Sequence, residues 1–292
     1  FKQKTAYEIS LGLVGSEMCI RDRLNQAFDQ LGAAMVHRGG LRIVTTLDAR
    51  LQDQVECAAR SHVNRLGGSD PDYVDFSSDG NSCASAAHLP PLRVKDVGVD
   101  RNVSNVAAVV LDPRTGEILS MLGSYDYWDK SIDGSFNVAV SGLRQPGSAF
   151  KPFTYLTAFS QGYTPSTMLL DVRTAFPIES GISYVPENYD RSFHGPVSVR
   201  TALSQSLNVP AVQVMTWVGV ENVLRSAHSM GINTLDEDKG VYGPALTLGG
   251  GEVTLLDMTY AFGVFANSGV MAGQPVSDSQ ARSGCLLYTS PS

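Results

Sequence analysis

Two short segments of this 292-residue chain carry side chains that could form and assist a nucleophile. Ser148 and Lys151 are three residues apart, and at the start of a helix two residues with this spacing lie on the same face. A lysine amine there can accept the proton of the serine hydroxyl, provided that burial lowers its pKa far enough for it to be neutral. On spacing alone an exposed serine and a solvated lysine is the simpler interpretation, because such a pair also arises by chance.

Two prolines indicate where Ser148 stands in its helix. Pro146 and Gly147 precede the serine, and Pro152 follows the lysine. Because proline lacks an N–H group, a helix tolerates it only in the first turn. The pattern therefore predicts that Ser148 lies at a helix N-terminus, where free backbone N–H groups and the helix dipole can stabilise a developing oxyanion.

The second segment runs from Ser206 to Pro210 and contains Asn208. Proline disfavours helical geometry in the residue before it. We therefore expect a turn over 206–209 between two helices, which presents a hydroxyl and an amide to a cleft. The alternative is a helix cap, because Ser and Asn are common caps, and for this segment taken alone the cap is favoured.

The elements around these segments indicate an α+β fold. Short apolar runs over 106–111 and 117–122 flank Asp112–Gly116 and predict a β-hairpin, and 41–46 predicts another strand. Helix signals cover 24–38, 48–66, 148–161, 199–205, 210–219 and 254–265. Residues 67–104 are rich in Gly, Ser, Asp and Pro, so we expect a long loop or linker and a domain boundary there. Helices beside a sheet without strict βαβ alternation are typical of the α+β class.

Composition excludes several other kinds of function. The net charge of -7 and the pI near 5.2 leave no basic stripe for nucleic acid and no polybasic patch for a membrane surface. No run of about 18 apolar residues predicts a membrane span. The five histidines are scattered without ligand spacing, so we expect no metal and no other cofactor. Cys57 and Cys83 could pair in an oxidising compartment, but two unpaired thiols are the favoured interpretation.

The two segments and their surroundings resemble the transpeptidase domain of class A penicillin-binding proteins. Arg144–Phe153 is similar to the nucleophile segment of that family, and Ala202–Val212 is similar to its Ser-x-Asn segment. Further similar segments, collinear over residues 24–275, are Gly40–Gln52, Asp112–Gly116, Glu187–Asp190, Leu248–Gly250 and Asn267–Gly269. The resemblance implies a serine β-lactamase/transpeptidase-like α+β fold, with an antiparallel sheet flanked by helices.

The same resemblance implies a peptidoglycan D,D-transpeptidase. Ser148 would attack the D-Ala-D-Ala end of a stem peptide, and an amine of a neighbouring stem peptide would resolve the acyl-enzyme into a cross-link. Lys151 would be the base, Ser206 would relay a proton to the leaving amine, and Asn208 would hold the substrate backbone or the lysine. β-Lactams would mimic the dipeptide and trap the acyl form. The implied location is the periplasm or the extracytoplasmic face of the bacterial cell membrane.

The resemblance also divides the chain. Residues 24–66 would form an N-terminal linker or pedestal, and 105–283 an incomplete transpeptidase domain, because the Lys-Thr/Ser-Gly strand of the family is absent from the sequence. We therefore expect a fold truncated before the C-terminal strands and an impaired enzyme. Residues 1–23 and 284–292 resemble translated sequencing adapter and are expected to be non-native. Membrane association is expected only through an N-terminal anchor that this sequence lacks.

Two other functions stay open at this point. A serine β-lactamase shares both motifs but needs a carboxylate to activate the deacylating water, and Glu187 is the candidate in this sequence. A non-catalytic β-lactam-binding sensor belongs to a different class and predicts that Ser148→Ala leaves the biological role intact. His194 is expected to be a loop residue that lines the groove rather than a base.

Overall fold

A computed structural model describes most of the chain, namely residues 45–177, 183–236 and 242–273. The helix predicted over 24–38, most of the strand over 41–46 and both ends expected to be non-native lie outside the described residues. Thr45 and Thr46, the described end of that strand, do not have strand conformation.

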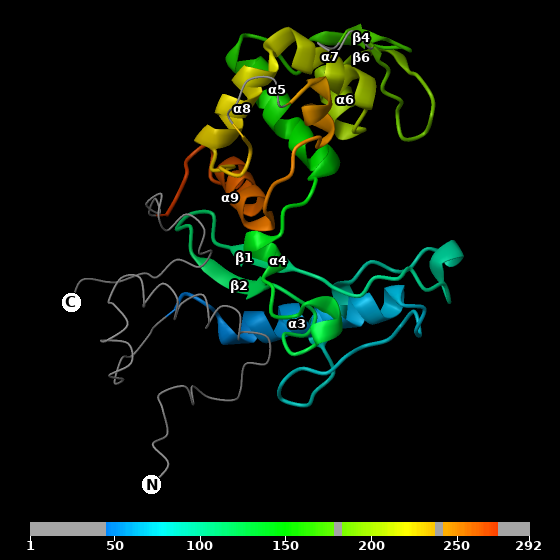
Figure 1. Cartoon of the computed structure of the whole chain (residues 1–292), viewed down its shortest axis with the longest axis vertical. Coiled ribbons are helices and arrows are strands. Elements are labelled where there is room, and N and C mark those ends of the chain that lie inside the picture. The colour runs from blue at the N-terminus through cyan, green and yellow to red at the C-terminus, as the bar shows by residue number, and fades with distance from the viewer. Residues whose placement is uncertain (1–44, 178–182, 237–241, 274–292) are drawn as a thin grey trace, which may run out of the picture. The chain divides into compact units, whose positions relative to one another are not determined.

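The described residues form two compact units (Figure 1), of which one comprises 45–142 and 262–273 and the other the described residues of 143–261. The chain passes from the first unit to the second after Gly142 and returns to the first unit after Ala261. It does not coincide with the boundary expected within 67–104, because that segment belongs to the first unit.

The first unit contains one long helix and an antiparallel hairpin. Its regular elements are α3 (Ala49–Leu66), β1 (Ala108–Leu111), β2 (Ile118–Leu122) and the short α4 (Val138–Ser141). Asp48 is the N-cap of α3, as predicted, and its carboxylate accepts two N–H groups of the first turn. The buried Gln52 amide oxygen accepts hydrogen bonds from Ser120 Oγ at 2.8 Å and Met121 N at 2.9 Å. These bonds satisfy a buried amide and join α3 to β2.

The hairpin turn confirms the prediction for Asp112–Gly116. Gly116 has a φ of 77°, and its N–H donates to Asp112 O at 2.8 Å. A Cβ at Gly116 would stand 2.5 Å from Ala272 O and 2.7 Å from Gly273 Cα. Both the left-handed backbone and the close approach therefore require glycine at this position.

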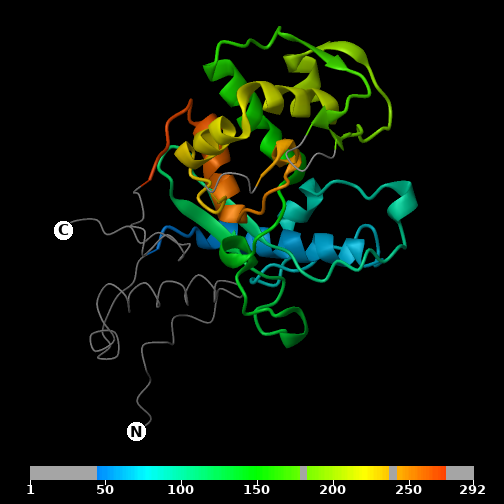
Figure 2. The ribbon, with the colours of Figure 1, turned by 45° about the horizontal axis from the view of Figure 1, so that its top comes forward.

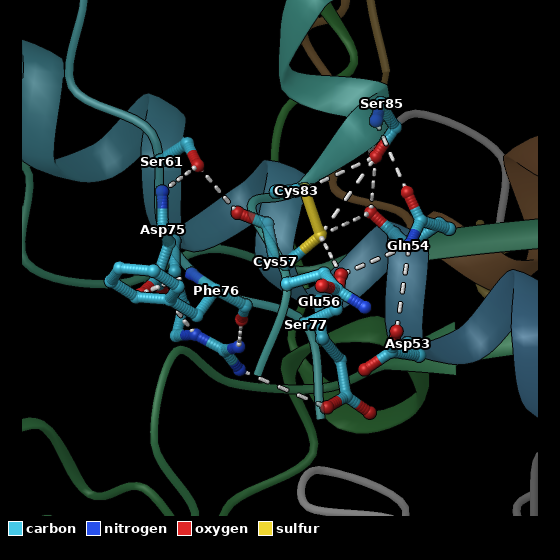
Figure 3. Close-up of a disulfide and its surroundings, with 12 residues drawn as sticks. Asp53, Gln54, Glu56, Cys57, Ser61, Asp75, Phe76, Ser77, Cys83 and Ser85 are labelled. Carbon is cyan, nitrogen blue, oxygen red and sulfur yellow. Dashed lines mark hydrogen bonds and ion pairs between the residues drawn. A yellow bond between two sulfur atoms is a disulfide. The ribbon is translucent and has the colours of Figure 1, made fainter. Parts of the chain in front are cut away.

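Segment 67–104 is attached to α3 rather than a free linker. Cys57 on α3 and Cys83 in the segment form a disulfide (Figure 3), so the expectation of two unpaired thiols is wrong. The two cysteines are buried together with Ala86, and Arg60 Nε donates to Asp75 Oδ2 at 2.5 Å. The sequence separation of 26 residues carries no signal of this contact, because the segment has to fold back along α3 first.

The second unit is mainly helical. Its elements are α5 (Lys151–Ser160), β3 (Met168–Asp171), β4 (Phe176–Pro177), β5 (Ser183–Tyr184), β6 (Gly195–Ser198), α6 (Val199–Ser204), α7 (Asn208–Val218), α8 (Val220–Ser229) and the first part of α9 (Leu255–Ala266). In Figure 2 the green helix α5 lies beside the yellow helices α7 and α8. The fully buried Phe150, Phe153 and Met215 contribute to the core of this unit.

The strands are short and all their pairings are antiparallel. In the described part of the chain β1 pairs with β2, β3 with β6, and β4 with β5, which gives three two-stranded sheets. The α+β class is confirmed, although these described strands do not join into one larger sheet. The predicted helix over 254–265 is confirmed as α9, in which the N–H of Asp257 donates to Thr254 Oγ1 at 3.1 Å.

Candidate active site

Ser148 lies in a tight turn that leads directly into α5. The 3₁₀ turn covers Gly147–Phe150, and the N–H of Lys151 donates to the carbonyl of Ser148. Pro152 occupies the first turn of α5, where its missing N–H costs no hydrogen bond. The predicted position of Ser148 at a helix start is confirmed, and the residue is exposed to solvent.

The backbone just before Ser148 is packed against a second glycine. Gly249 has a φ of +85°, and a Cβ there would lie 2.2 Å from Gly147 N and 2.5 Å from Gly147 Cα. Gly147 itself has a φ of +58°. Glycine at 249 therefore lets the two backbone segments meet and fixes the turn that presents Ser148.

The Lys151 side chain is fully buried and ends among three oxygen atoms. Its Nζ donates to Ser206 O at 2.5 Å, to Asn208 Oδ1 at 2.7 Å and to Ser206 Oγ at 3.1 Å. Burial lowers the pKa of Lys151 from its usual 10.5 to about 8. About one tenth of the amine is therefore neutral at pH 7, the form that a proton acceptor requires.

Ser206 lies in a sharp turn at the end of α6. Its φ is 56°, its N–H donates to Leu203 O at 3.1 Å, and the N–H of Leu207 donates to Ala202 O at 2.9 Å. This pair of bonds, with a left-handed residue between helix and exit, is a Schellman motif. The turn directs both oxygens of Ser206 toward the lysine.

One detail of the predicted turn is wrong. Helix α7 begins at Asn208 and includes Val209, whereas Pro210 was expected to keep Val209 out of helical geometry. Pro210 is the third residue of α7, within the first turn, where a proline is tolerated. The Asn208 side chain does not cap its own helix: Oδ1 accepts from Lys151 Nζ, and Nδ2 donates to Glu187 O at 2.7 Å.

The structure thus brings Lys151, Ser206 and Asn208 into one hydrogen-bonded cluster. Ser148 lies three residues before Lys151, in the 3₁₀ turn that leads into α5. Among the described residues no hydrogen bond joins Ser148 Oγ to Lys151 Nζ. Sequence reasoning assigned no role to Asn188, whose amide oxygen accepts from Asn208 N at 2.8 Å. The sequence points to Asn188 only through the similarity of the segment Glu187–Asp190 to the family.

Among the described residues, the side chains of His194 and Glu187 make no hydrogen bond to the cluster of Lys151, Ser206 and Asn208. His194 Nδ1 lies 2.7 Å from Asp171 Oδ2, and Glu187 contacts the cluster through its main-chain carbonyl. In the residues that the structure describes, no three His, Cys, Asp or Glu side chains are grouped as a metal ion requires. No helix in this described part has the length and apolar character of a bilayer span.

Comparison with known proteins gives the class to which this fold and site belong. The family model described as penicillin binding protein transpeptidase domain matches residues 106–281. The chain therefore belongs to the penicillin-binding protein transpeptidase domain family, whose members are acyl-transferring enzymes.

Individual relatives agree with this family. Penicillin-binding protein 1A of Neisseria meningitidis is 33% identical over 194 residues, which is 64% of this chain and 23% of the relative. The protein of the same name from Aquifex aeolicus is 41% identical over 162 residues, which is 55% of this chain and 21% of the relative. The chain thus spans less than a quarter of the length of these curated relatives.

Solved structures share the fold. The crystal structure of penicillin-binding protein 1A from Haemophilus influenzae has a TM-score of 0.68 at 20% identity and covers 86% of this chain and 46% of its own. The PonA1 protein from Mycobacterium tuberculosis in complex with penicillin V has a TM-score of 0.64 at 21% identity, over 89% of this chain and 61% of its own. Both confirm the transpeptidase-like α+β fold expected from the sequence.

Proposed function

We propose that this chain carries the acyl-transfer centre of a peptidoglycan D,D-transpeptidase, with Ser148 as the nucleophile. The observation that carries the proposal is the buried Lys151 amine, with a pKa of about 8, three residues after an exposed serine at a helix start. The match to the transpeptidase domain family supports the same activity, and the names of the curated relatives support the binding of penicillin.

In the proposed first step Lys151 Nζ takes the proton of Ser148 Oγ while that oxygen bonds to the carbonyl carbon of the penultimate D-Ala. The bond between this carbon and the nitrogen of the terminal D-Ala then breaks. The departing nitrogen receives the proton through Ser206 Oγ, which lies 3.1 Å from Lys151 Nζ. An ester on Ser148 remains, and a stem-peptide amine attacks it in the reverse sequence of proton transfers.

Asn208 has a supporting part in this proposal. Its Oδ1 holds the lysine at 2.7 Å, so the amine keeps its place during both half-reactions. The backbone N–H of Ser148, at the start of the helical segment, would provide one donor to the oxyanion. The family's second donor belongs to the Lys-Thr/Ser-Gly strand, a motif absent from these 292 residues, so we propose that this chain acylates slowly.

The proposed location is the periplasm or the outer face of the cell membrane, with stem peptides as substrates and β-lactams as inhibitors. The Cys57–Cys83 disulfide supports an oxidising compartment. The penicillin V complex of one structural relative supports β-lactam binding. A deacylating hydrolase is less favoured, because Glu187 reaches the cluster through its backbone.

The test is labelling of the chain with a fluorescent penicillin, followed by mass-spectrometric mapping of the adduct. We expect a slow but persistent ester on Ser148, absent in Ser148→Ala and retained in the matched control Ser204→Ala, whose exposed hydroxyl bonds only within α6. Complete absence of the adduct after prolonged incubation would refute the role of Ser148. Labelling as fast as that of Neisseria meningitidis penicillin-binding protein 1A would refute the impairment, and rapid turnover of nitrocefin would instead favour a β-lactamase.

A further inference from the structure

The first turn of α7 is capped by a side chain from another part of the chain. The residue at the N-cap position, Leu207, has no polar side chain, although the first N–H groups of a helix lack partners within it. Asn188 Oδ1 accepts from Asn208 N at 2.8 Å and from Val209 N at 3.4 Å. Asn188 therefore does for α7 what a Ser or Asp cap normally does from within the same turn.

The orientation of the Asn188 amide is fixed by its other partners. The side chain is buried, with 4% exposure, and its Nδ2 donates to both oxygens of Asp171, each at 2.9 Å, and to Ser192 O at 2.8 Å. All partners of Nδ2 are acceptors and both partners of Oδ1 are donors. The amide can therefore not be turned over without losing its hydrogen bonds.

Asp171 holds this arrangement from the end of β3. Its carboxylate is fully buried and, besides Asn188, it faces His194, whose backbone N lies 2.9 Å and whose Nδ1 lies 2.7 Å from Oδ2. His194 Nε2 in turn lies 3.4 Å from Asp190 Oδ2. A buried carboxylate is costly unless its oxygens are hydrogen-bonded, so these contacts keep Asp171 in one place. The sequence predicts a loop residue at His194 but gives no sign of its contact with Asp171.

The segment that contains Glu187 and Asn188 holds Asn208 by hydrogen bonds to two separate atoms. Asn188 Oδ1 holds the backbone N of Asn208, and the neighbouring Glu187 O holds its side-chain Nδ2 at 2.7 Å. The remaining amide atom, Oδ1, is then directed at Lys151 Nζ at 2.7 Å. Few rotations of Asn208 are compatible with all three contacts.

We propose that the buried Asp171–Asn188 pair is a positioning device for the Lys151 amine, acting through Asn208. The pair fixes the start of α7, and the start of α7 fixes the acceptors around Nζ. Neither residue touches the amine, so both are positioning residues rather than catalytic ones. The proposal rests on the proposed function, because it gives Asn188 a purpose only if Lys151 acts as the base.

The test uses the ionisation of Lys151, which can be measured without any acylation. The chain contains six lysines, so an NMR spectrum of protein with carbon-13 at lysine Cε contains only a few signals. The signal that disappears in Lys151→Arg belongs to Lys151. Asn188→Leu removes the cap but keeps the volume of the side chain. Since the acceptors that favour the charged amine disperse while burial persists, we expect the pKa of Lys151 to fall about one unit further. The neutral amine is then no longer held in place, so the acylation rate of Ser148 above pH 9, where Lys151 is neutral in both proteins, should fall about tenfold or more.

The matched control is Thr157→Val. It removes a buried hydroxyl bonded to Ser226 at 2.9 Å in the same unit, but it leaves Asp171, Asn188 and Asn208 alone. The control should therefore lower stability while leaving the Lys151 titration unchanged. A Lys151 titration that stays the same in Asn188→Leu would overturn the proposal, and so would a rise toward 10.5, which would mean loss of burial instead of loss of acceptors.

Asp171→Asn is the milder second variant, and it carries the test if Asn188→Leu does not fold. It keeps the shape of the site but replaces one of the two oxygens that accept from Asn188 Nδ2 by an NH₂ donor, so we expect a smaller fall in the pKa of Lys151. An unchanged titration in this folded variant would equally overturn the proposal. If wild-type Ser148 is never acylated while both variants shift Lys151, the proposed function fails and the positioning role stands.

Discussion

Acylation of Ser148 should follow the deprotonation of Lys151. With a pKa of about 8, the neutral fraction of the amine is roughly one hundredth at pH 6, roughly one tenth at pH 7 and about half at pH 8. An ordinary lysine with a pKa of 10.5 would be less than about 0.1% neutral at pH 7. The second-order rate constant for acylation should therefore rise about tenfold from pH 6 to pH 7 and level off above pH 9.

The perturbation that isolates this effect is Lys151→Arg. A guanidinium remains charged at every accessible pH, so the variant has no neutral base at any point of the profile. General base catalysis typically contributes about 10²- to 10⁴-fold, and we expect a loss in that range at pH 8. The exposed Lys130 provides the control: Lys130→Arg keeps the wild-type profile because this side chain lies in the other unit.

The assay is the time course of fluorescent penicillin incorporation between pH 6 and pH 9, with the folded state checked at each pH by circular dichroism. Wild-type chain should show a single ionisation with its midpoint near 8. A flat profile, or a rate that still rises tenfold per unit at pH 9, would refute the argument that burial makes the Lys151 amine a base.

Two further predictions concern the supports of the site and of the first unit. Replacing Cys57 and Cys83 by Ser should destabilise the first unit by about 3.5 kcal/mol, the loop-closure entropy for a separation of 26 residues. Hydrogen-exchange mass spectrometry would then show faster exchange in α3 but not in α5, and equal protection of α3 with and without the disulfide would contradict this. Gly249→Ala should displace Gly147 and slow acylation at least about tenfold, whereas Gly243→Ala, whose Cβ meets nothing within 4 Å, should not; equal rates would disprove the first effect.

The parts of the molecule that the sequence predicts well obey local rules. Pro152 restricts Ser148 to a helix start, Gly116 supplies the left-handed position of a hairpin turn, and Asp48 caps the helix that follows it. In each case the deciding interaction lies within about five residues of the signal, so no knowledge of the tertiary fold is required.

The parts that the sequence does not predict depend on contacts between distant segments. Pro210 correctly suggests a break near Asn208, but the helix begins earlier because Asn188, 20 positions upstream, supplies the missing cap. The Cys57–Cys83 bond likewise requires 67–104 to lie along α3. An asparagine or a cysteine has the same appearance in the sequence whether or not a partner reaches it, so such pairings follow only from the folded chain.

The backbone of Ser206 supports a functional rather than a capping reason for this serine. Its left-handed φ of 56° occupies the position of a Schellman motif that glycine fills without strain, and a serine there costs on the order of 1 kcal/mol. Glycine is the usual residue at this position where it serves only to end a helix. The hydroxyl that glycine lacks is the group that lies 3.1 Å from Lys151 Nζ, and the proton relay that we propose for this hydroxyl would account for the retained strain.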